Sequence, residues 1–185
     1  TLRRYFILAT KKCRIYAAFG VSQTPTTHKR KKERMHIMKV LIVYHSEHHD
    51  NTKKLVDAIA GQGDVTLLNA SENSNLNWSD YDLIGFASGI YYQKFHKDIL
   101  DSAEKNLPLG KKVFFLYTCG VKRNSYTDAM RQIAEAKKAQ ILGSYGCLGF
   151  DTFGPFKLVG GIAKGHPDDK DMSDALNFYH KLKNI

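Results

Sequence analysis

Residues 39–52 read KVLIVYHSEHHDNT, in which a run of branched apolar side chains changes abruptly into polar ones. The apolar run at residues 40–44 is too short for a helix and rich in β-branched side chains, so it predicts a strand buried on both faces, as in a parallel sheet. From Thr52 to Ala60 the apolar residues recur at helical spacing, and the glycines that follow end that pattern. The stretch therefore predicts a strand, a loop and a helix in succession.

The loop at residues 46–51 lies directly before the predicted helix. A helix N-terminus presents unpaired N–H groups and a partial positive charge, so hydroxyl and amide side chains placed there can help to hold an anion. A simpler interpretation is that Asp50 or Asn51 caps the helix without any ligand. The local sequence leaves both interpretations open.

The rest of the chain alternates between strand and helix patterns. Four further strands are predicted at residues 65–68, 83–87, 113–117 and 141–150, and three further helices at residues 95–106, 126–138 and 171–183. Residues 69–82 show no helical period, so one crossover helix is missing. Strands that alternate with helices predict an α/β fold, here a doubly wound five-stranded parallel sheet in a three-layer α/β/α arrangement.

The formal net charge of +10 comes almost entirely from the first 38 residues. That segment has ten Lys or Arg and one acid, Glu33, a balance of +9, whereas the other 147 residues have 18 basic and 17 acidic side chains, a balance of +1. A nearly neutral body lacks the basic face that nucleic acids bind. We therefore expect no nucleic-acid partner for the folded body.

We expect residues 1–37 to lie outside the folded domain, which then spans residues 38–185. The basic cluster HKRKKER at residues 28–34 is typical of a solvated, disordered tail, or of an electrostatic arm for nucleic acid or anionic lipid. A third hypothesis is that the segment is non-native upstream sequence read in frame. In this hypothesis the codons before Met35 and Met38 resemble a ribosome-binding site, and the natural start is one of these two residues.

Three cysteines, at positions 13, 119 and 147, form no CxxC pair. This spacing argues against a zinc site and a disulfide framework and is compatible with a reducing compartment. No apolar run approaches the roughly 20 residues that span a bilayer. We therefore expect a cytoplasmic protein with no metal and no membrane insertion.

Ligands of doubly wound sheets bind beyond the carboxyl ends of the strands. Three loops of this chain follow such strand ends, at residues 46–52, 88–96 and 118–126. We expect these loops to converge on one site.

The order of strands and loops, together with the first loop motif, resembles the flavodoxin family over nearly all of residues 39–185. The phosphate loop of that family opens with Ser or Thr and closes with Thr at the helix start, as Ser46 and Thr52 do here. This loop is one residue longer than the common flavodoxin loop and closer in length to that of flavodoxin-like protoporphyrinogen oxidases. The resemblance implies that FMN is the cofactor and that Ser46, His48, Asn51 and Thr52 hold its phosphate, with Glu47 as a further cofactor-binding residue of this loop.

The resemblance assigns the other two loops to the isoalloxazine ring of FMN. The second loop would supply Ser88, Gly89, Ile90, Tyr91 and Tyr92, with one tyrosine stacked on the ring, and the third would supply Thr118, Cys119 and Gly120 at the ring edge. Cys119 invites a thiol-redox role, but no second cysteine lies near it in the sequence, so we expect it to line the site. For His96 we expect helix capping or packing rather than catalysis.

The resemblance implies an electron carrier, which binds FMN, passes electrons between a reductase and an acceptor enzyme, and has no catalytic residue of its own. The alternative is an FMN-dependent oxidoreductase of the protoporphyrinogen oxidase or quinone reductase type. The longer phosphate loop and the aromatic, glycine-rich residues 151–169 favour this alternative, because the latter are typical of a lid or docking loop. A non-flavin binding module becomes preferable if the carboxylates of Glu47 and Asp50 exclude a phosphate. Of the three we favour the carrier.

Overall fold

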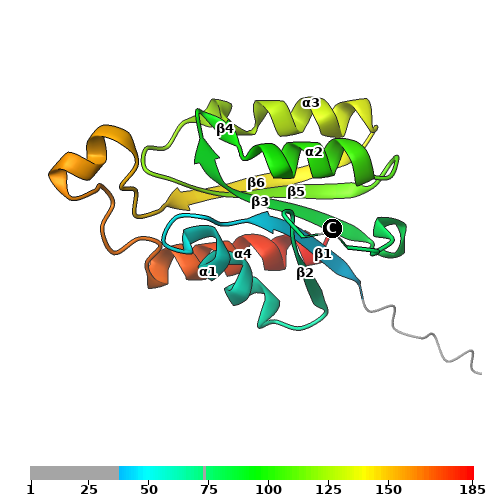
Figure 1. The fold of residues 1–185 in the computed structure, drawn as a ribbon. Helices are drawn as coiled ribbons and strands as arrows, with labels where there is room; N and C mark the ends of the chain where they lie inside the picture. Colours follow the sequence, from blue (N-terminus) through cyan, green and yellow to red (C-terminus); the bar gives the residue numbers. More distant parts are fainter. Residues whose placement is uncertain (1–37, 73) are drawn as a thin grey trace, which may run out of the picture. The chain divides into compact units, whose positions relative to one another are not determined.

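The computed structural model describes residues 38–72 and 74–185, and the expectations for residues 1–37 lie outside this part of the chain. A six-stranded sheet forms the middle layer (Figure 1). Five parallel strands follow the order β2-β1-β3-β5-β6, namely β1 (Val40–His45), β2 (Val65–Asn69), β3 (Leu83–Tyr91), β5 (Lys112–Cys119) and β6 (Gln140–Leu148). The short strand β4 (Lys94–Phe95) pairs with β3 in the antiparallel direction.

Helices cover both faces of this sheet. They are α1 (Asn51–Ala60), α2 (Lys97–Asn106), α3 (Asp128–Ala136) and α4 (Asp169–Lys183). Figure 1 shows α2 and α3 together on one face and α1 and α4 on the other, and each of these two pairs is in contact. The predicted doubly wound, five-stranded parallel α/β fold with three layers is thereby confirmed.

Side chains that alternate along each strand divide the core between the two faces of the sheet. On β1, Leu41 and Val43 belong to the core beneath α2 and α3, and Val40 and Ile42 belong to the core beneath α1 and α4. All four side chains are fully buried. Both faces of β1 are therefore apolar, which explains the unbroken run of branched residues in its sequence.

The segment predicted as a loop at residues 88–96 is instead a strand end and a hairpin. β3 continues to Tyr91, and Ile90 pairs with Phe95 of β4, so that α2 begins only at Lys97. Tyr92 and Gln93 turn the chain with φ angles of 49° and 65°, both in the left-handed region, as in a type I′ hairpin turn. Glycine or asparagine usually marks such a turn, and neither is present here. The prediction was wrong because this signal was missing.

Smaller differences concern element boundaries. The helix predicted at residues 126–138 is a 3-10 helix, η2 (Asn124–Thr127), followed directly by the shorter α3, and α4 begins two residues earlier than predicted. Residues 69–82 contain no α-helix, as expected, but include a 3-10 turn, η1 (Trp78–Asp80). β6 carries a bulge, since Val113 of β5 pairs with Ile141 and Phe114 with Gly143, which leaves Leu142 without a partner in the ladder.

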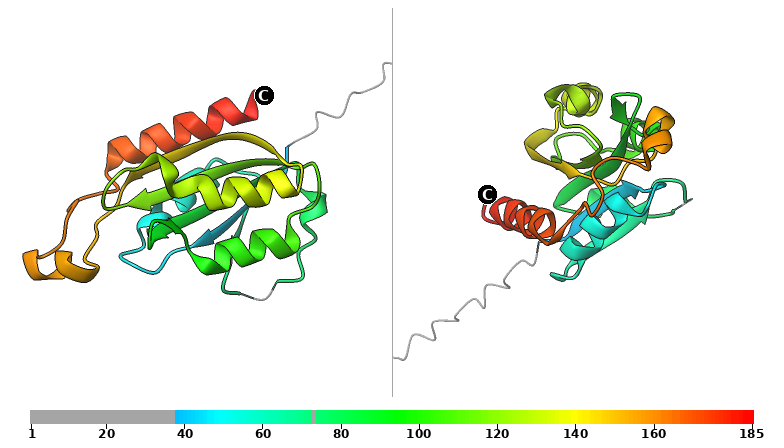
Figure 2. Two further views of the ribbon diagram at one scale, coloured as in Figure 1. Left: turned by 90° about the horizontal axis from the view of Figure 1, so that it is seen from above. Right: turned by 90° about the vertical axis from the view of Figure 1, so that its left-hand side faces the viewer.

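Residues 149–168, which we call the arm, leave the sheet after β6 and return to α4 (Figure 2). The arm contains the 3-10 helix η3 (Gly154–Val159), and Asp151 pairs with Ile162 across its base in an antiparallel bridge. Figure 2 shows η3 projecting from the carboxyl edge of the sheet. Among the described residues, no helix has the length and apolar character needed to cross a bilayer.

The close packing between β3 and β5 provides a test of the fold. A Cβ atom added at Gly85 would lie 2.4 Å from Cζ of Phe114. We expect Gly85→Ala to lower the free energy of unfolding by about 1–3 kcal/mol, the usual penalty for an overpacked core. Urea denaturation followed by circular dichroism measures this change.

Gly61→Ala is the matched control, because an added Cβ there meets no atom closer than 3.5 Å and the backbone φ is −59°. An unchanged stability of Gly85→Ala, or an equal loss in Gly61→Ala, would contradict the described packing.

Candidate functional site

A cleft of about 570 Å³, part of it open to solvent, lies at the carboxyl edge of the sheet. The loop between β1 and α1, the β3–β4 hairpin, the loop after β5 and the arm form its walls. Twelve of the thirteen residues predicted for the site line this cleft: Ser46, Glu47, His48, Asn51, Thr52, Gly89, Ile90, Tyr91, Tyr92, Thr118, Cys119 and Gly120. The three loops therefore converge as expected, because parallel strands bring their carboxyl ends to one edge.

Ser88 is the exception, because it does not line the cleft. Its side chain is fully buried, and its Oγ accepts a hydrogen bond from the backbone N–H of His96 at 2.9 Å. The hydroxyl also donates to the carbonyl oxygen of Gly89 at 2.5 Å. Ser88 thus fastens the hairpin to the start of α2.

His96 is the N-cap residue of α2. Its Nδ1 accepts the backbone N–H of Asp98 at 3.3 Å, which confirms the expected capping role.

Four arm residues complete the lining, namely Gly149, Phe150, Asp151 and Phe153. Asp151 and Phe153 belong to the segment 151–169 that was expected to form a lid or docking loop, whereas Gly149 and Phe150 were predicted to end a strand. Several contacts join this part of the arm to the first loop, two of them through His49. The rings of His49 and Phe150 lie 4.4 Å apart, and Nε2 of His49 lies 3.1 Å from Oγ1 of Thr152. The position of the arm after the last parallel strand was the available signal, since the carboxyl end of β6 reaches the same edge as the other strands.

The N-terminus of α1 opens into the cleft without a side-chain cap. Asp50 occupies the N-cap position in the left-handed conformation, with a φ of 53°, and makes no side-chain cap hydrogen bond. Within the described residues, the backbone N–H groups of His48, His49, Asp50 and Thr52 have no hydrogen-bond acceptor. The simpler interpretation, that Asp50 or Asn51 caps the helix, therefore fails, and the helix end is left as an anion-binding position.

Buried polar side chains continue the cleft inward from this helix end. Oγ1 of Thr52 lies 2.9 Å from Oγ1 of Thr118, and both residues are buried. Nδ2 of Asn51 donates to the carbonyl oxygen of Phe150 at 2.8 Å, whereas Oδ1 of Asn51 is buried and has no partner among the described residues. A buried acceptor without a donor is unfavourable, so this atom is placed to accept a hydrogen bond from a ligand.

Aromatic rings form the outer wall and the rim of the cleft. The ring of Tyr91 lies 5.9 Å from that of His48, and Tyr92 meets Phe153 edge to face at 5.9 Å. Tyr92 is 84% exposed and Phe153 is 55% exposed, so the rim presents apolar surface to solvent. Burial, together with the carboxylate of Glu47, raises the pKa of Tyr91 to about 12, so its phenol is neutral at physiological pH.

A family model described as a flavodoxin domain matches residues 41–147 of the chain. The chain belongs to the flavodoxin family. An uncharacterized protein of Methanocaldococcus jannaschii is 38% identical over 143 residues, which cover 76% of this chain and 95% of that protein. The family comprises flavoproteins, and the predicted resemblance is confirmed.

Solved structures of other flavodoxin-like proteins share the fold. A flavodoxin from the domain Archaea superposes with a TM-score of 0.56 at 15% identity, over 78% of this chain and 99% of that one. An NADPH-quinone reductase from P. pentosaceus superposes with a TM-score of 0.54 at 15% identity, over 79% of this chain and 97% of that one. At this level of identity the likeness concerns the fold alone.

In this flavodoxin-family chain, Cys119 forms part of the inner wall of the cleft. Its Sγ lies 3.5 Å from the carbonyl oxygen of Cys147, and both cysteines are free and buried. Burial raises the pKa of the Cys119 thiol to about 11, and Lys122 offsets this only in part. The thiolate is the reactive form of cysteine, so the geometry supports a lining role rather than thiol-redox chemistry.

The raised pKa predicts slow reaction of Cys119 with thiol reagents. In a Cys13→Ser, Cys147→Ser background, the native protein should react with Ellman's reagent far more slowly at pH 7.5 than after unfolding in urea. The rate should increase about tenfold per pH unit up to pH 10, because the thiolate fraction increases in that proportion below the pKa. A rate that levels off below pH 9 would contradict the raised pKa.

Proposed function

We propose that this protein binds FMN in the cleft and carries electrons between a reductase and an acceptor enzyme. The observation that carries the proposal is the uncapped N-terminus of α1, where backbone N–H groups without acceptors meet the hydroxyls of Ser46 and Thr52. A phosphate group satisfies such N–H groups and is stabilised by the positive end of the helix dipole.

The phosphate of FMN would lie against this helix end. Oγ of Ser46 already accepts the backbone N–H of Lys53 at 3.2 Å, which holds the hydroxyl at the mouth of the loop. The two carboxylates of the loop remain compatible with an anion, because Glu47 and Asp50 are both exposed and can turn toward solvent. Aspartate also adopts the left-handed conformation of position 50 more readily than most residues.

The flavin ring would occupy the space between the aromatic rim and the wall formed by the loop after β5. A Cβ atom added at Gly120 would lie 2.7 Å from Oδ2 of Asp151, so this wall has no room for a larger residue. Oδ1 of Asn51 offers the buried acceptor for a hydroxyl or N–H group of the cofactor. FMN would supply one- and two-electron chemistry that side chains do not provide near neutral pH, and the protein would position the cofactor and exclude water.

The exposed rim supports carriage of electrons rather than turnover of a buried substrate. Tyr92, Phe153 and Val121 are all more than half exposed. A redox partner could dock on this apolar surface and approach the ring edge. Because residues 39–185 are nearly neutral, recognition would depend more on apolar contacts than on long-range steering by charge.

An FMN-dependent oxidoreductase of the protoporphyrinogen oxidase or quinone reductase type is the second candidate. The arm favours it, because Asp151 and Phe153 extend the wall of the cleft beyond the sheet, where a substrate could lie beside the flavin. For either function we propose a cytoplasmic location, which the two free cysteines of the described domain support.

Reductive titration distinguishes the two functions. The protein is purified, mixed with FMN and freed of excess flavin, and dithionite is then added while absorption is recorded. A carrier should take up the two electrons in separate one-electron steps. Reduction in a single two-electron step, together with turnover of a quinone or a porphyrinogen, would instead favour the enzyme. A protein that retains no FMN would contradict both.

Thr52→Val tests the position of the phosphate. We expect FMN to bind at least fivefold more weakly, about 1 kcal/mol or more, because a hydroxyl that bonds to a charged group is lost while side-chain shape is kept. Quenching of FMN fluorescence measures the affinity. Thr66→Val on β2, outside the cleft, is the matched control and should leave the affinity unchanged. Equal affinities of Thr52→Val and the parent protein would place the phosphate elsewhere.

A further inference from the structure

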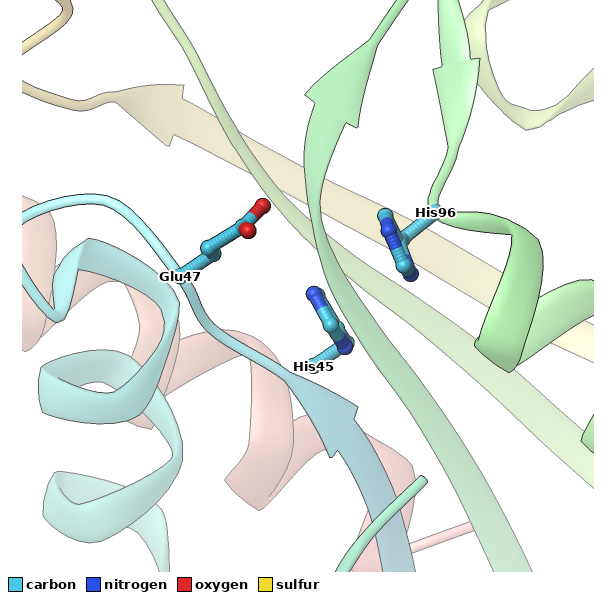
Figure 3. A group of neighbouring side chains, drawn as sticks. All are labelled: His45, Glu47 and His96. Atoms are coloured by element: carbon cyan, nitrogen blue, oxygen red, sulfur yellow. The ribbon is translucent and has the colours of Figure 1, made fainter. Parts of the chain in front are cut away.

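Two histidines stack on each other beside the cleft. His45 ends β1, and His96 precedes α2, so the fold joins residues that are far apart in the sequence (Figure 3). Their ring centroids are 3.6 Å apart and the ring planes differ by 7°. Neither histidine lines the cleft. Tyr91 does, and its ring lies 5.0 Å from that of His96 and 6.0 Å from that of His45.

The two nitrogens of His45 have different surroundings. Nδ1 lies 3.3 Å from Oγ of Ser71 and 3.5 Å from Oδ2 of Asp98, and the Ser71 hydroxyl donates to the same carboxylate oxygen at 3.0 Å. Nε2 is buried and has no hydrogen-bond partner among the described residues. Since buried polar atoms are normally paired, this nitrogen is an unsatisfied lone pair or N–H group that requires an explanation.

Glu47 brings a carboxylate to the same place. One oxygen of Glu47, one ring nitrogen of His45 and one of His96 all lie within 4.8 Å of one another. Figure 3 shows the carboxylate of Glu47 turned toward the two rings. Glu47 is exposed and the side chain of His45 is only 12% exposed, so the group is buried on one side and open to solvent on the other.

We propose that His45, Glu47 and His96 bind one divalent transition-metal ion, with Zn²⁺ as the reference ion. Two imidazoles and one carboxylate form a donor set that suits Zn²⁺ and related ions, and the solvent side leaves a position for water. Ligand atoms about 2.1 Å from a tetrahedral ion lie roughly 3.4 Å apart. The three ligand atoms lie within 4.8 Å of one another, and the two rings are stacked and parallel. A tilt of the His96 ring together with rotation of the exposed Glu47 would direct all three atoms at one ion.

Asp98 would be the outer partner of this site. Metal-bound histidines usually donate their second N–H to a carboxylate, which fixes the ring and increases its basicity. Oδ2 of Asp98 lies 3.5 Å from Nδ1 of His45 and 3.6 Å from Nδ1 of His96. On metal binding through Nε2, Nδ1 of His96 would stop accepting the backbone N–H of Asp98 in the cap of α2 and would donate to this carboxylate instead.

A second cluster is formed by His166, Asp168 and Asp171. Its side chains already form hydrogen bonds within the cluster. Nδ1 of His166 lies 2.6 Å from Oδ2 of Asp171, and the two aspartates form the capping box at the start of α4. Its members already satisfy one another, so this cluster is explained by helix capping.

Calorimetric titration of the flavin-free protein with Zn²⁺ tests the proposal. The full chain is used without a histidine tag, and Co²⁺ is added in parallel to give visible absorption bands. We expect one ion per chain, no binding of Mg²⁺ at the same concentration, and at least a tenfold loss of Zn²⁺ affinity in His96→Gln and in Glu47→Gln. Asp98→Asn should weaken binding about 10- to 100-fold without removing a ligand.

His48→Gln is the matched control, since His48 lies in the same loop but outside the proposed ligand set. It should bind Zn²⁺ as the parent protein does. Equal Zn²⁺ affinity in His96→Gln, Glu47→Gln and His48→Gln would overturn the proposal, because the ion would then be bound elsewhere in the chain. The same conclusion follows if the parent protein binds no Zn²⁺.

Misfolding of a variant and failure to bind FMN can both be told apart from loss of the metal site. Glu47 is exposed, so Glu47→Gln should fold like the parent protein, and circular dichroism verifies this even if His96→Gln is unstable. No flavin is present, so loss of the metal site and failure to bind FMN are separate results.

Discussion

The parallel pairing of β1 with both of its neighbours is the constraint on which the rest of the structure depends. Parallel neighbours cannot be joined by a tight turn, so each connection must cross a face of the sheet and return to the opposite edge. This requirement buries both faces of β1 and places α1 and α4 opposite α2 and α3. It also brings the carboxyl ends of all five parallel strands to one edge, where residues as distant as Thr52 and Thr118 come within hydrogen-bond distance.

The fold class and the three layers could be predicted because burial against distant segments leaves a pattern in the local sequence. A strand covered on both faces must be apolar throughout, and a helix that covers it must repeat its apolar residues at helical spacing, so β1 and α1 were evident from residues 40–60 alone. The hairpin left no such pattern. Its turn uses Tyr92 and Gln93 in a conformation that glycine normally adopts, and β4 has only two residues. A pairing this short is stabilised by Phe95 in the core rather than by a pattern along the chain.

The candidate site, too, could be predicted only in part from the sequence. Residues that follow a predicted strand were assigned to the site at the edge of the sheet. Ser88 was assigned in this way, but its side chain is turned inward and fastens the hairpin. Gly149 and Phe150 were assigned to a strand instead, because their place at the cleft depends on contacts such as that between Phe150 and His49. The stacked histidines were likewise hidden, since nothing near His45 in the sequence indicates that His96 lies against it.

The bulge in β6 has a consequence for the behaviour of the protein at high concentration. In the described part of the chain β6 is an outer strand of the sheet, and an outer strand offers unpaired N–H and C=O groups to strands of other molecules. The extra residue Leu142 and the adjacent Gly143, with a φ of 154°, bend this edge and increase its twist. A bent edge is a poor template for a further strand, so the β6 edge is disfavoured as a site for the edge-to-edge growth that leads to aggregation.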